Sequence, residues 1–434
     1  MSDRPSRHRS ATGVVSPARP STIAFAAAVR PRGRGSLALA ACAVSAVLAL
    51  VSACGGGGGA SGTALTSTDS TTSSASAWSE GTVSGFGSVI VNGVRYDDST
   101  ATVVDDDGLT TKVTLGARVE VTSSSVTTAS DDTRTAVAGS ITVRSQLTGP
   151  VASVDTASFV ALGQTVDVTE ATVFDSTLAS GLSSLVAGST VVRVHGLVDS
   201  VTGHLLATRV ESVTAATAYA LRGTVSALDT TATTFNLGGA AIVYGSASNI
   251  PTTLADGQSV RVVLSTTPDS AGRWVATAFG KAARSTTAAT DARVRGTVTT
   301  YTSATSFAVN GITVDASAVT SLPSTLAVGV EVEVQGTLAN GVLVASAVTL
   351  KSEARGSGSQ AKERYELHGT ISALDVTAQT FVVRGVTVSY GSVTSWLPSG
   401  ASAASLVDGV KVTVKGALGS DRSTLTATTV RIRS

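Results

Sequence analysis

From residue 81 onward the chain alternates short apolar runs with polar residues and tight turns. In Phe307-Ala308-Val309-Asn310-Gly311-Ile312-Thr313-Val314, two alternating runs flank an Asn-Gly pair. Asn-Gly between such runs is the strongest short-range signal of a two-residue β-hairpin turn. Because side chains alternate along a strand, pairing across this turn predicts Val309 opposite Ile312 and Phe307 opposite Val314, all on one face.

The same hairpin is predicted elsewhere in the chain. Its apolar positions recur as Val89, Val91, Val94 and Tyr96; as Phe235, Leu237, Ala240 and Ile242; and as Phe381, Val383, Val386 and Val388. A weaker copy has Phe159 and Val166 in place, but Gln164 stands where an apolar residue is expected. The pattern therefore predicts one such hairpin in each of several similar units.

Two further segments accompany each hairpin. The first is an apolar residue, two spacers and Gly before an alternating strand, as in Leu326-x-x-Gly329. The second is an Ala followed three positions later by a large apolar residue, as in Ala345 and Val348. Residues three apart lie on opposite faces of a regular strand, so we expect the Ala on the other face, at a close approach across a barrel wall.

A fixed long period relates these units. Gly223-Thr224-Val225, Gly296-Thr297-Val298 and Gly369-Thr370-Ile371 follow one another at intervals of 73 residues (296 minus 223, and 369 minus 296), after two earlier copies at Gly81 and Gly149. Such a period indicates one supersecondary unit used repeatedly. The predicted β repeats, numbered one to five below, are residues 81–144, 149–213, 223–281, 296–351 and 369–434.

The repeats predict the fold class. A single sheet with one apolar face must curl or pair to bury that face. We therefore predict an all-β chain, a tandem array of about five small antiparallel OB-like β-barrels. A unit of roughly sixty residues buries only about 60% of its unfolded surface, so neighbouring repeats are expected to support one another. The polar joins 280–295 and 352–368 would instead let units move, which leaves the rigidity of the array open.

Residues 1–53 read as a lipoprotein signal peptide with a long basic start. Its seven arginines precede an uncharged apolar run, 36–53, for which a simple membrane anchor is the alternative. The run ends in Leu50-Val51-Ser52-Ala53-Cys54 before Gly55–Gly59, which resembles the lipobox of bacterial lipoproteins. The resemblance implies lipidation of Cys54, export, and anchoring to the outer membrane of a Gram-negative cell. Residues 54–80 would then be the lipidated Cys and a Gly/Ser/Thr tether.

Charge and aromatic content restrict the partners. Lys and Arg number 31 against 30 Asp and Glu, and aromatic residues make up only 4% of the chain. Nucleic-acid binding needs a basic surface, and single-strand binding adds stacking aromatics. We therefore expect no nucleic-acid partner. The expected partners are the membrane, through the lipid anchor at Cys54, and an envelope protein or glycan.

Motifs for catalysis do not emerge from the sequence. His195, His204 and His368 are scattered, and each is expected to be a single solvated side chain. A zinc site needs three or four convergent ligands, and no such spacing is present. No Gly-x-Ser-x-Gly nucleophile elbow occurs either. We therefore predict a protein that is not an enzyme and needs no cofactor.

Two weak candidate sites remain. Asp105-Asp106-Asp107-Gly108 is typical of a turn, and its three carboxylates are also a weak calcium candidate, although calcium takes six to eight oxygens. Trp396, Tyr244 and Tyr390 are weak candidates for ligand binding near loops. Covering a barrel end is the alternative role of Trp396.

One segment of the first repeat is more specific. Ser84-Gly85-Phe86-Gly87-Ser88-Val89-Ile90-Val91-Asn92-Gly93-Val94-Arg95-Tyr96-Asp97, with Val113-x-x-Gly116 downstream, resembles the bacterial domain-of-unknown-function family 5666. The resemblance is strongest in the first repeat and looser in the other four, which lack the Gly-Phe-Gly-Ser element. It implies exported, often lipidated proteins with tandem β-rich repeats, and no established activity.

These observations favour a non-enzymatic cell-envelope lipoprotein that serves as a structural or interaction module of tandem β-barrels. A periplasmic or surface protein that binds an oligosaccharide or small molecule in barrel mouths and loops is the alternative. An enzyme ranks third, because no cluster of acidic or His residues is evident. The sequence leaves open the partner, the oligomeric state, the true translation start and the membrane face on which the protein is displayed.

Overall fold

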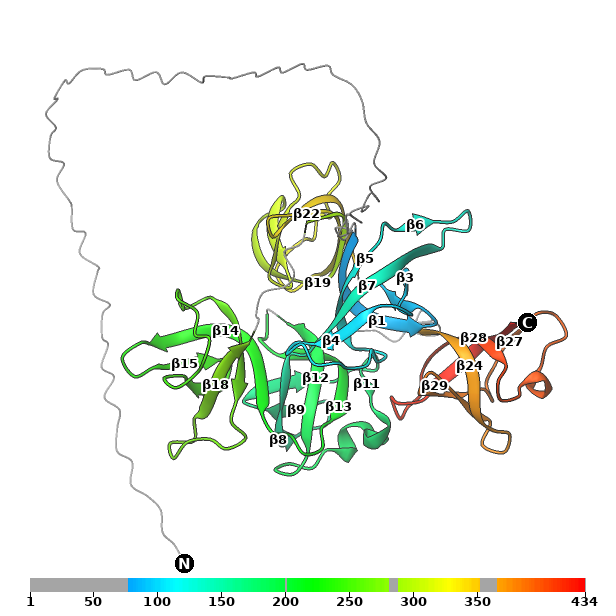
Figure 1. The fold of residues 1–434 in the computed structure, drawn as a ribbon, viewed down its shortest axis with the longest axis horizontal. Helices are drawn as coiled ribbons and strands as arrows, with labels where there is room; N and C mark the ends of the chain where they lie inside the picture. The colour runs from blue at the N-terminus through cyan, green and yellow to red at the C-terminus, as the bar shows by residue number, and fades with distance from the viewer. Residues whose placement is uncertain (1–76, 200, 281–287, 352–364, 434) are drawn as a thin grey trace, which may run out of the picture. The chain divides into compact units, whose positions relative to one another are not determined.

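The computed structural model describes residues 77–199, 201–280, 288–351 and 365–433 (Figure 1). The expected signal peptide, Cys54 and nearly all of the expected tether lie outside the described residues. Within the described ranges, no helix has the length and apolar character needed to cross a membrane.

The fourth repeat shows the plan of the fold. Its strands are β19 (Ala289–Ser303), β20 (Ser306–Val309), β21 (Ile312–Asp315), β22 (Glu331–Ala339) and β23 (Val342–Leu350). β19 pairs antiparallel with β20, β20 with β21, β22 with β23, and β22 with β19, whereas β21 and β23 run parallel. These pairings close the sheet into a five-stranded barrel of mixed strand direction (Figure 1).

The same order of pairings recurs along the chain. The first repeat contains β1 (Ala77–Phe86), β2 (Val89–Val91), β3 (Val94–Asp97), β5 (Arg118–Ser123) and β7 (Arg134–Arg144), and the second contains β8 (Leu147–Val154), β9 (Ser158–Ala161), β10 (Gln164–Asp167), β12 (Val191–Val198) and β13 (Leu205–Ser212). The third repeat contains β14 (Tyr219–Asp229), β15 (Thr234–Leu237), β16 (Ala240–Val243), β17 (Ser259–Leu264) and β18 (Trp274–Gly280), and the fifth contains β24 (Tyr365–Asp375), β25 (Thr380–Val383), β26 (Val386–Ser389), β28 (Lys411–Leu418) and β29 (Leu425–Arg433). The extra strands β4 (Thr102–Asp105), β6 (Thr127–Thr128), β11 (Val173–Phe174) and β27 (Ser395–Leu397) pair with the last strand of their repeat. Short 3-10 helices lie at Ser176–Leu178, Gly181–Ser184 and Ala403–Ser405.

The prediction of repeated all-β barrels is confirmed, but their purely antiparallel character is wrong. Each ring contains one parallel pairing, between its third and fifth strands, as β3 with β7 and β10 with β13 show. The reason is geometric, since an odd number of strands cannot alternate in direction all the way round a closed ring. At least one neighbouring pair must then be parallel.

The hairpin registers agree with the predictions. Val309 pairs with Ile312 and Phe307 with Val314, and all four side chains are buried. The corresponding pairs in other repeats are Val89 with Tyr96, Phe235 with Ile242, and Phe381 with Val388. The two-residue alternation therefore gave both the pairing and the buried face.

The third sequence segment behaves differently from the prediction. Ala345 and Val348, expected on opposite faces, are both buried. Between β22 and β23 the register shifts, so that Gln335 pairs with Ala347 and Gly336 with Ala345. The intervening residue of β23 is a β-bulge, and the extra residue brings two positions three apart onto the same face.

The apolar cores extend over more than one repeat. One cluster joins the first and fifth repeats, for example through Phe86 and Leu367, and a second joins the second and third repeats. A third contains the fourth repeat together with Trp78 of β1. β1 begins at Ala77, so Trp78 lies on a strand of the first barrel and not in the predicted tether, and its buried side chain packs in the core of the fourth repeat.

Backbone pairing also crosses between repeats. The start of β1 runs parallel to β19, with Ala77 opposite Asp291 and Glu80 opposite Val294. The end of β1 runs parallel to β24, and β8 pairs antiparallel with β14. The first repeat therefore contacts both the fourth and the fifth through a single strand.

Candidate functional site

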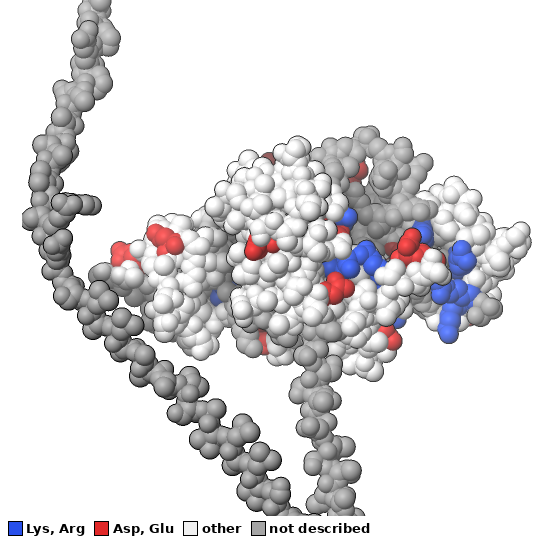
Figure 2. All heavy atoms as spheres, turned by 90° about the horizontal axis from the view of Figure 1, so that it is seen from above, with Lys and Arg blue, Asp and Glu red and all other residues white. Residues whose placement is uncertain are grey.

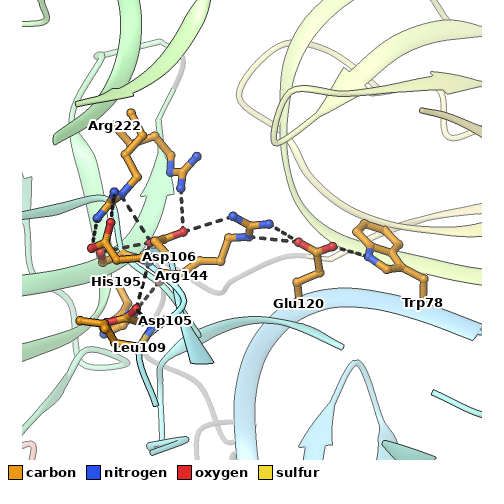
Figure 3. Close-up of polar contacts among 11 residues, drawn as sticks. Trp78, Asp105, Asp106, Leu109, Glu120, Arg144, His195 and Arg222 are labelled. Atoms are coloured by element: carbon orange, nitrogen blue, oxygen red, sulfur yellow. Dashed lines mark hydrogen bonds and ion pairs between the residues drawn. The ribbon is translucent and has the colours of Figure 1, made fainter. Parts of the chain in front are cut away.

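A cluster of buried charged side chains lies where the first three repeats meet, around Asp106 (Figure 3). Asp106 follows β4, and its Oδ1 atom lies 3.2 Å from Nη1 of Arg144 and 2.8 Å from Nη2 of Arg222. Its Oδ2 atom accepts a hydrogen bond of 2.8 Å from the backbone N–H of Ser145 and lies 3.9 Å from Nε of Arg261. One carboxylate of the first repeat thus contacts arginines of the first and third repeats.

The turn that presents Asp106 is built by its neighbours. Oδ1 of Asp105 accepts hydrogen bonds from the backbone N–H groups of Asp107 (2.9 Å) and Leu109 (3.0 Å), which closes the turn. Gly108 has a φ of +78°, a conformation that favours glycine. Asp107 receives both Nη atoms of Arg261, at 2.6 and 2.7 Å. The predicted turn is present, and it holds two carboxylates against the third repeat.

A second carboxylate continues the network within the first repeat (Figure 3). Glu120 of β5 forms an ion pair with Arg144 and accepts a hydrogen bond of 2.8 Å from Nε1 of Trp78. Burial alone would lower the pKa of Arg144, but the charges of Glu120, Asp106 and Glu80 and a hydrogen bond to Glu120 outweigh it and raise the pKa. Arg144 therefore stays charged and links Glu120 to Asp106.

His195 of β12 adds the second repeat to this site, and the expectation that it is solvated is wrong. The residue is only 1% exposed. Its Nδ1 atom lies 2.6 Å from the carbonyl oxygen of Arg144, so Nδ1 carries the proton and donates. Its Nε2 atom lies 3.7 Å from Oε2 of Glu211. The histidine is buried because the first repeat covers the outer face of β12.

Glu211 of β13 connects the same two repeats. Its Oε1 atom accepts hydrogen bonds from Oγ1 of Thr114 (3.0 Å) and Nε of Arg209 (2.5 Å). Arg209 in turn donates from Nη1 to the carbonyl oxygen of Leu115 at 3.0 Å. Burial would raise the pKa of Glu211, but the hydrogen bond and charge of His195, together with those of Arg209, hold it far below its ordinary value.

A further polar junction lies between the first and fourth repeats. Nη2 of Arg118 lies 3.0 Å from Oε1 of Glu80, and its Nη1 atom donates to the carbonyl oxygen of Arg295 at 3.2 Å. Asn310 of the predicted Asn-Gly turn donates from Nδ2 to Oε1 of Glu80 at 3.3 Å. The turn residue therefore contributes to packing between repeats as well as to the hairpin.

Only limited space is open at the network itself. A cavity of about 90 Å³ is lined by Asp105, Asp106, Asp107, Val143, Ser145, Thr148, Arg193, His195, Ala218, Tyr219, Ala220, Arg261 and Val263. A water molecule occupies about 30 Å³ in the liquid, so this space suits a few waters and is too small for an oligosaccharide. The polar groups of the site thus face one another across the junction.

A larger hollow of about 850 Å³ opens on the surface of the second repeat and the segment that follows it. Its lining is uncharged and comprises Thr177, Leu178, Ser184, Val186, Ser189, Thr190, Val191, Ser212, Val213, Thr214, Ala215, Ala216 and Tyr219. Hydroxyl and aliphatic side chains line it in equal number, together with the ring of Tyr219. Its volume is large enough for a drug-sized ligand.

The weak candidates from the sequence take other positions. Tyr244 and Tyr390 are buried and pack against Phe235 and Phe381, with ring centroids 5.3 and 5.7 Å apart. Trp396 on β27 is half-buried against the core shared by the first and fifth repeats. The three rings are therefore parts of barrel cores or their covers.

The described residues hold no group of three or more His, Cys, Asp or Glu placed to bind a metal ion. Asp106 and Asp107 face the guanidinium groups of Arg144, Arg222 and Arg261. Nearby positive charge disfavours a cation at these carboxylates.

Sequence reasoning missed the network, although one signal was available. A charged residue stands directly before the repeated Gly-Thr pair in three repeats, as Glu80, Arg222 and Arg295. All three take part in contacts between repeats, Glu80 and Arg222 through their side chains and Arg295 through its carbonyl oxygen. Strand alternation places these residues away from their own barrel core; another repeat covers Glu80 and Arg222, whereas Arg295 keeps 34% of its side chain exposed.

Comparison with known families gives a match over three stretches. Residues 148–211, 295–349 and 368–431 match the family described as Domain of unknown function (DUF5666). They correspond to the second, fourth and fifth repeats. The first repeat, where the sequence analysis placed the strongest resemblance, lies outside the matched ranges, yet it has the same order of strand pairings. A search of the curated proteins found no match.

Proposed function

We propose that this chain, which carries three stretches of the domain of unknown function DUF5666, is a non-enzymatic cell-envelope lipoprotein. Its OB-like barrels would act together as a structural or interaction module. The observation that carries the proposal is the ion-pair network around Asp106. There, Asp106 forms ion pairs with Arg144 of its own repeat and with Arg222 and Arg261 of the third repeat, so the buried charges neutralise one another.

The surface is consistent with such a role. Figure 2 shows charged side chains only as scattered groups on the face drawn, most of which is neither acidic nor basic. Such a surface suits contact with a neutral partner, such as a glycan or an envelope protein, better than contact with a nucleic-acid backbone. Attachment to the outer membrane would come from the acyl chains of the lipid on Cys54. One acyl chain binds a membrane only weakly, whereas several together anchor a protein stably.

The anchor is tested by gel electrophoresis of the protein from cells that express Cys54→Ala. We expect this variant to migrate on gels as the larger, unlipidated precursor, which keeps the apolar run 36–53. Cys42→Ala is the matched control, because Cys42 lies inside the expected signal peptide and should change nothing. Migration of Cys54→Ala identical to that of the wild type would contradict lipidation at Cys54.

The module role is tested separately, on purified protein. The proposal expects the full chain to remain a single folded assembly of repeats, in which Asp106→Asn loosens contacts between repeats while each barrel stays folded. Hydrogen exchange resolved by peptide distinguishes the two levels of structure. Loss of protection throughout the barrels, with no selective change at the junctions, would contradict it.

The alternative, a ligand-binding protein, is favoured by the hollow of about 850 Å³ beside Tyr219. Its volume lies in the range of small-molecule sites. Calorimetric titration with maltohexaose, a neutral oligosaccharide, tests this role, with Tyr219→Ala as the variant. Saturable binding that Tyr219→Ala abolishes would support the alternative over the module, and no heat of binding would count against an oligosaccharide of this type.

A further inference from the structure

The Gly85-Phe86-Gly87 segment at the end of β1 distinguishes the first repeat from the other four. In the structure, the first strand of the fifth repeat lies directly against it. β1 and β24 pair in parallel, with Gly85 opposite Glu366 and Phe86 opposite Leu367. The segment is therefore a contact between the two ends of the described chain.

Both glycines are required by the closeness of this contact. A Cβ atom on Gly85 would lie 2.0 Å from the carbonyl oxygen of Glu366. A Cβ atom on Gly87 would lie 1.9 Å from Cβ of His368, and Gly87 also has a φ of +135°. Neither distance is compatible with non-bonded contact, so any side chain at these positions would push β24 away.

The other repeats lack this feature. Counted from the repeated glycine, the position of Gly85 is occupied by Ser153, Ala227, Thr300 and Ala373. Each of these residues has a Cβ atom. Among the five repeats, only the first therefore lacks a Cβ atom at this point of its opening strand.

Side chains add apolar and charged contacts around the pairing. Phe86 and Leu367 belong to the single core that joins the first and fifth repeats. Arg95 Nη2 lies 3.0 Å from Glu366 Oε1, which also lies 2.9 Å from Nε2 of His368. Of these two contacts only Arg95–Glu366 crosses between the repeats; it is partly exposed and contributes little stability, but it favours this strand in this register.

We propose that Gly85-Phe86-Gly87 is a strand-docking site dedicated to the Glu366-Leu367-His368 segment of the fifth repeat in the same chain. Its ligand is a β-strand edge, recognised through backbone pairing, a glycine notch without Cβ atoms, and the charge of Arg95. Strand addition of this kind gives affinity through the main chain and specificity through side chains. The inference concerns the described repeats and does not depend on the lipid anchor.

Hydrogen exchange of the full chain tests the proposal, with Gly85→Ala as the first variant. No positive φ constrains Gly85, so alanine suits its backbone and the steric conflict falls mainly on the fifth repeat. We expect the peptide covering 365–369 to exchange at least about tenfold faster, while β12 and β13 are unchanged. Gly139→Ala is the matched control, because a Cβ there would meet nothing closer than Thr122 O at 3.7 Å.

One contact inside the first repeat needs its own control. A Cβ on Gly85 would also lie 2.9 Å from Cδ1 of Ile90. Ile90→Val removes that atom, so Gly85→Ala with Ile90→Val should still expose 365–369. Recovery of wild-type protection in the double variant would mean that Ile90 caused the effect, and it would overturn the proposal.

A second pair of variants separates docking from general damage. His368→Gly removes the Cβ atom that a methyl group on Gly87 would strike, whereas His368→Ala keeps it. Gly87→Ala should therefore speed hydrogen exchange at 365–369 less in the His368→Gly background than in the His368→Ala background. Each double variant is compared with its own His368 single variant. The strain of a positive φ at Gly87 is common to both and cancels. Equal protection in the two double variants, or unchanged exchange in Gly85→Ala, would overturn the proposal.

Light scattering of the same samples identifies the source of the docked strand. Docking within one chain predicts a monomer at every concentration, with Gly85→Ala unchanged in mass. A wild-type dimer that dissociates on Gly85→Ala would show that the strand comes from a second copy, and it would overturn docking within one chain.

Discussion

Arg222 places its Nη2 atom 2.8 Å from Oδ1 of Asp106, although the two residues belong to different repeats. Both side chains are largely removed from solvent, with 12% and 3% of their surfaces exposed. Removing a charge from water is costly unless a partner compensates it. The pair therefore makes the packing of the third repeat on the first a condition for satisfying buried charge.

Asp106→Asn should destabilise the protein by about 3–5 kcal/mol, because it leaves buried arginines without their carboxylate. The midpoint of thermal unfolding measures this effect. Asp132→Asn is the matched control, since Asp132 is exposed and its positive φ of 63° suits asparagine equally well. A loss no larger than that of the control would mean that the network contributes no net stability.

Glu211 should make the stability of the protein sensitive to acid. Burial tends to raise its pKa above the ordinary value of 4.5. The hydrogen bonds and charges of His195 and Arg209 outweigh this effect, so the pKa in the folded protein is lowered. A carboxylate with a depressed pKa stabilises the fold fully above its unfolded pKa, and this stabilisation is lost as the pH falls below that value. Glu211→Gln removes the effect, so its deficit relative to wild type should be large near neutral pH and shrink in acid.

Urea unfolding at about pH 7 and about pH 3 measures this convergence. Glu170→Gln serves as the control, because Glu170 is exposed and should lose nothing at either pH. A deficit of Glu211→Gln that stays constant between the two conditions would contradict the assignment of acid sensitivity to this residue.

Gln164 explains one departure from the sequence pattern. Its Nε2 atom donates to the carbonyl oxygens of Leu237 (2.8 Å) and Leu162 (3.0 Å), and Leu237 belongs to the third repeat. Gln164→Leu restores the apolar alternation but leaves two carbonyls without this donor, so we expect a loss of about 1–3 kcal/mol. Gln164→Glu keeps the size and should be worse, because a carboxylate repels both carbonyls. Thermal stability of Gln164→Leu at or above wild type would contradict this account.

The parts of the fold that depend on local alternation could be predicted from the sequence. The pairing of Phe307 with Val314 follows from the period of two and the Asn-Gly turn alone. The strand directions could have been corrected by counting, because five strands in a ring require a parallel pair. The β-bulge beside Ala345 could not be predicted from the alternation. It depends on a close approach at Gly336, where a Cβ atom would lie 2.0 Å from the carbonyl oxygen of Val344.

Burial that depends on another repeat was beyond the sequence pattern. His195 stands at an outward position of β12 and is buried because Arg144 and Glu211 lie against that face. Gly85 looked like a feature of its own strand, whereas its partner is Glu366, in the last repeat. Local periodicity distinguishes the inner from the outer face of a barrel, but it carries no information on which outer faces another barrel covers.

Asn310 should be sensitive to loss of its amide. Its Oδ1 atom accepts from the backbone N–H of Thr297 at 3.1 Å, and its Nδ2 atom donates to Arg295 O and to Glu80 Oε1, both at 3.3 Å. Asn310→Asp removes these donors and places a second carboxylate beside Glu80, so we expect a loss of about 1–3 kcal/mol. The loss should fall on the junction of the first and fourth repeats.

Asn340→Asp is a close control for Asn310→Asp. Asn340 also precedes glycine in a hairpin turn, and its φ of 53° nearly equals the 51° of Asn310, but it is exposed to solvent. Backbone effects of the substitution are therefore shared, and the difference between the variants reports the contact with Glu80. Hydrogen exchange should quicken in the segments of β1 and β19 that pair with each other for Asn310→Asp alone. Equal exchange in both variants would show that the turn, and not the junction, determines the role of Asn310.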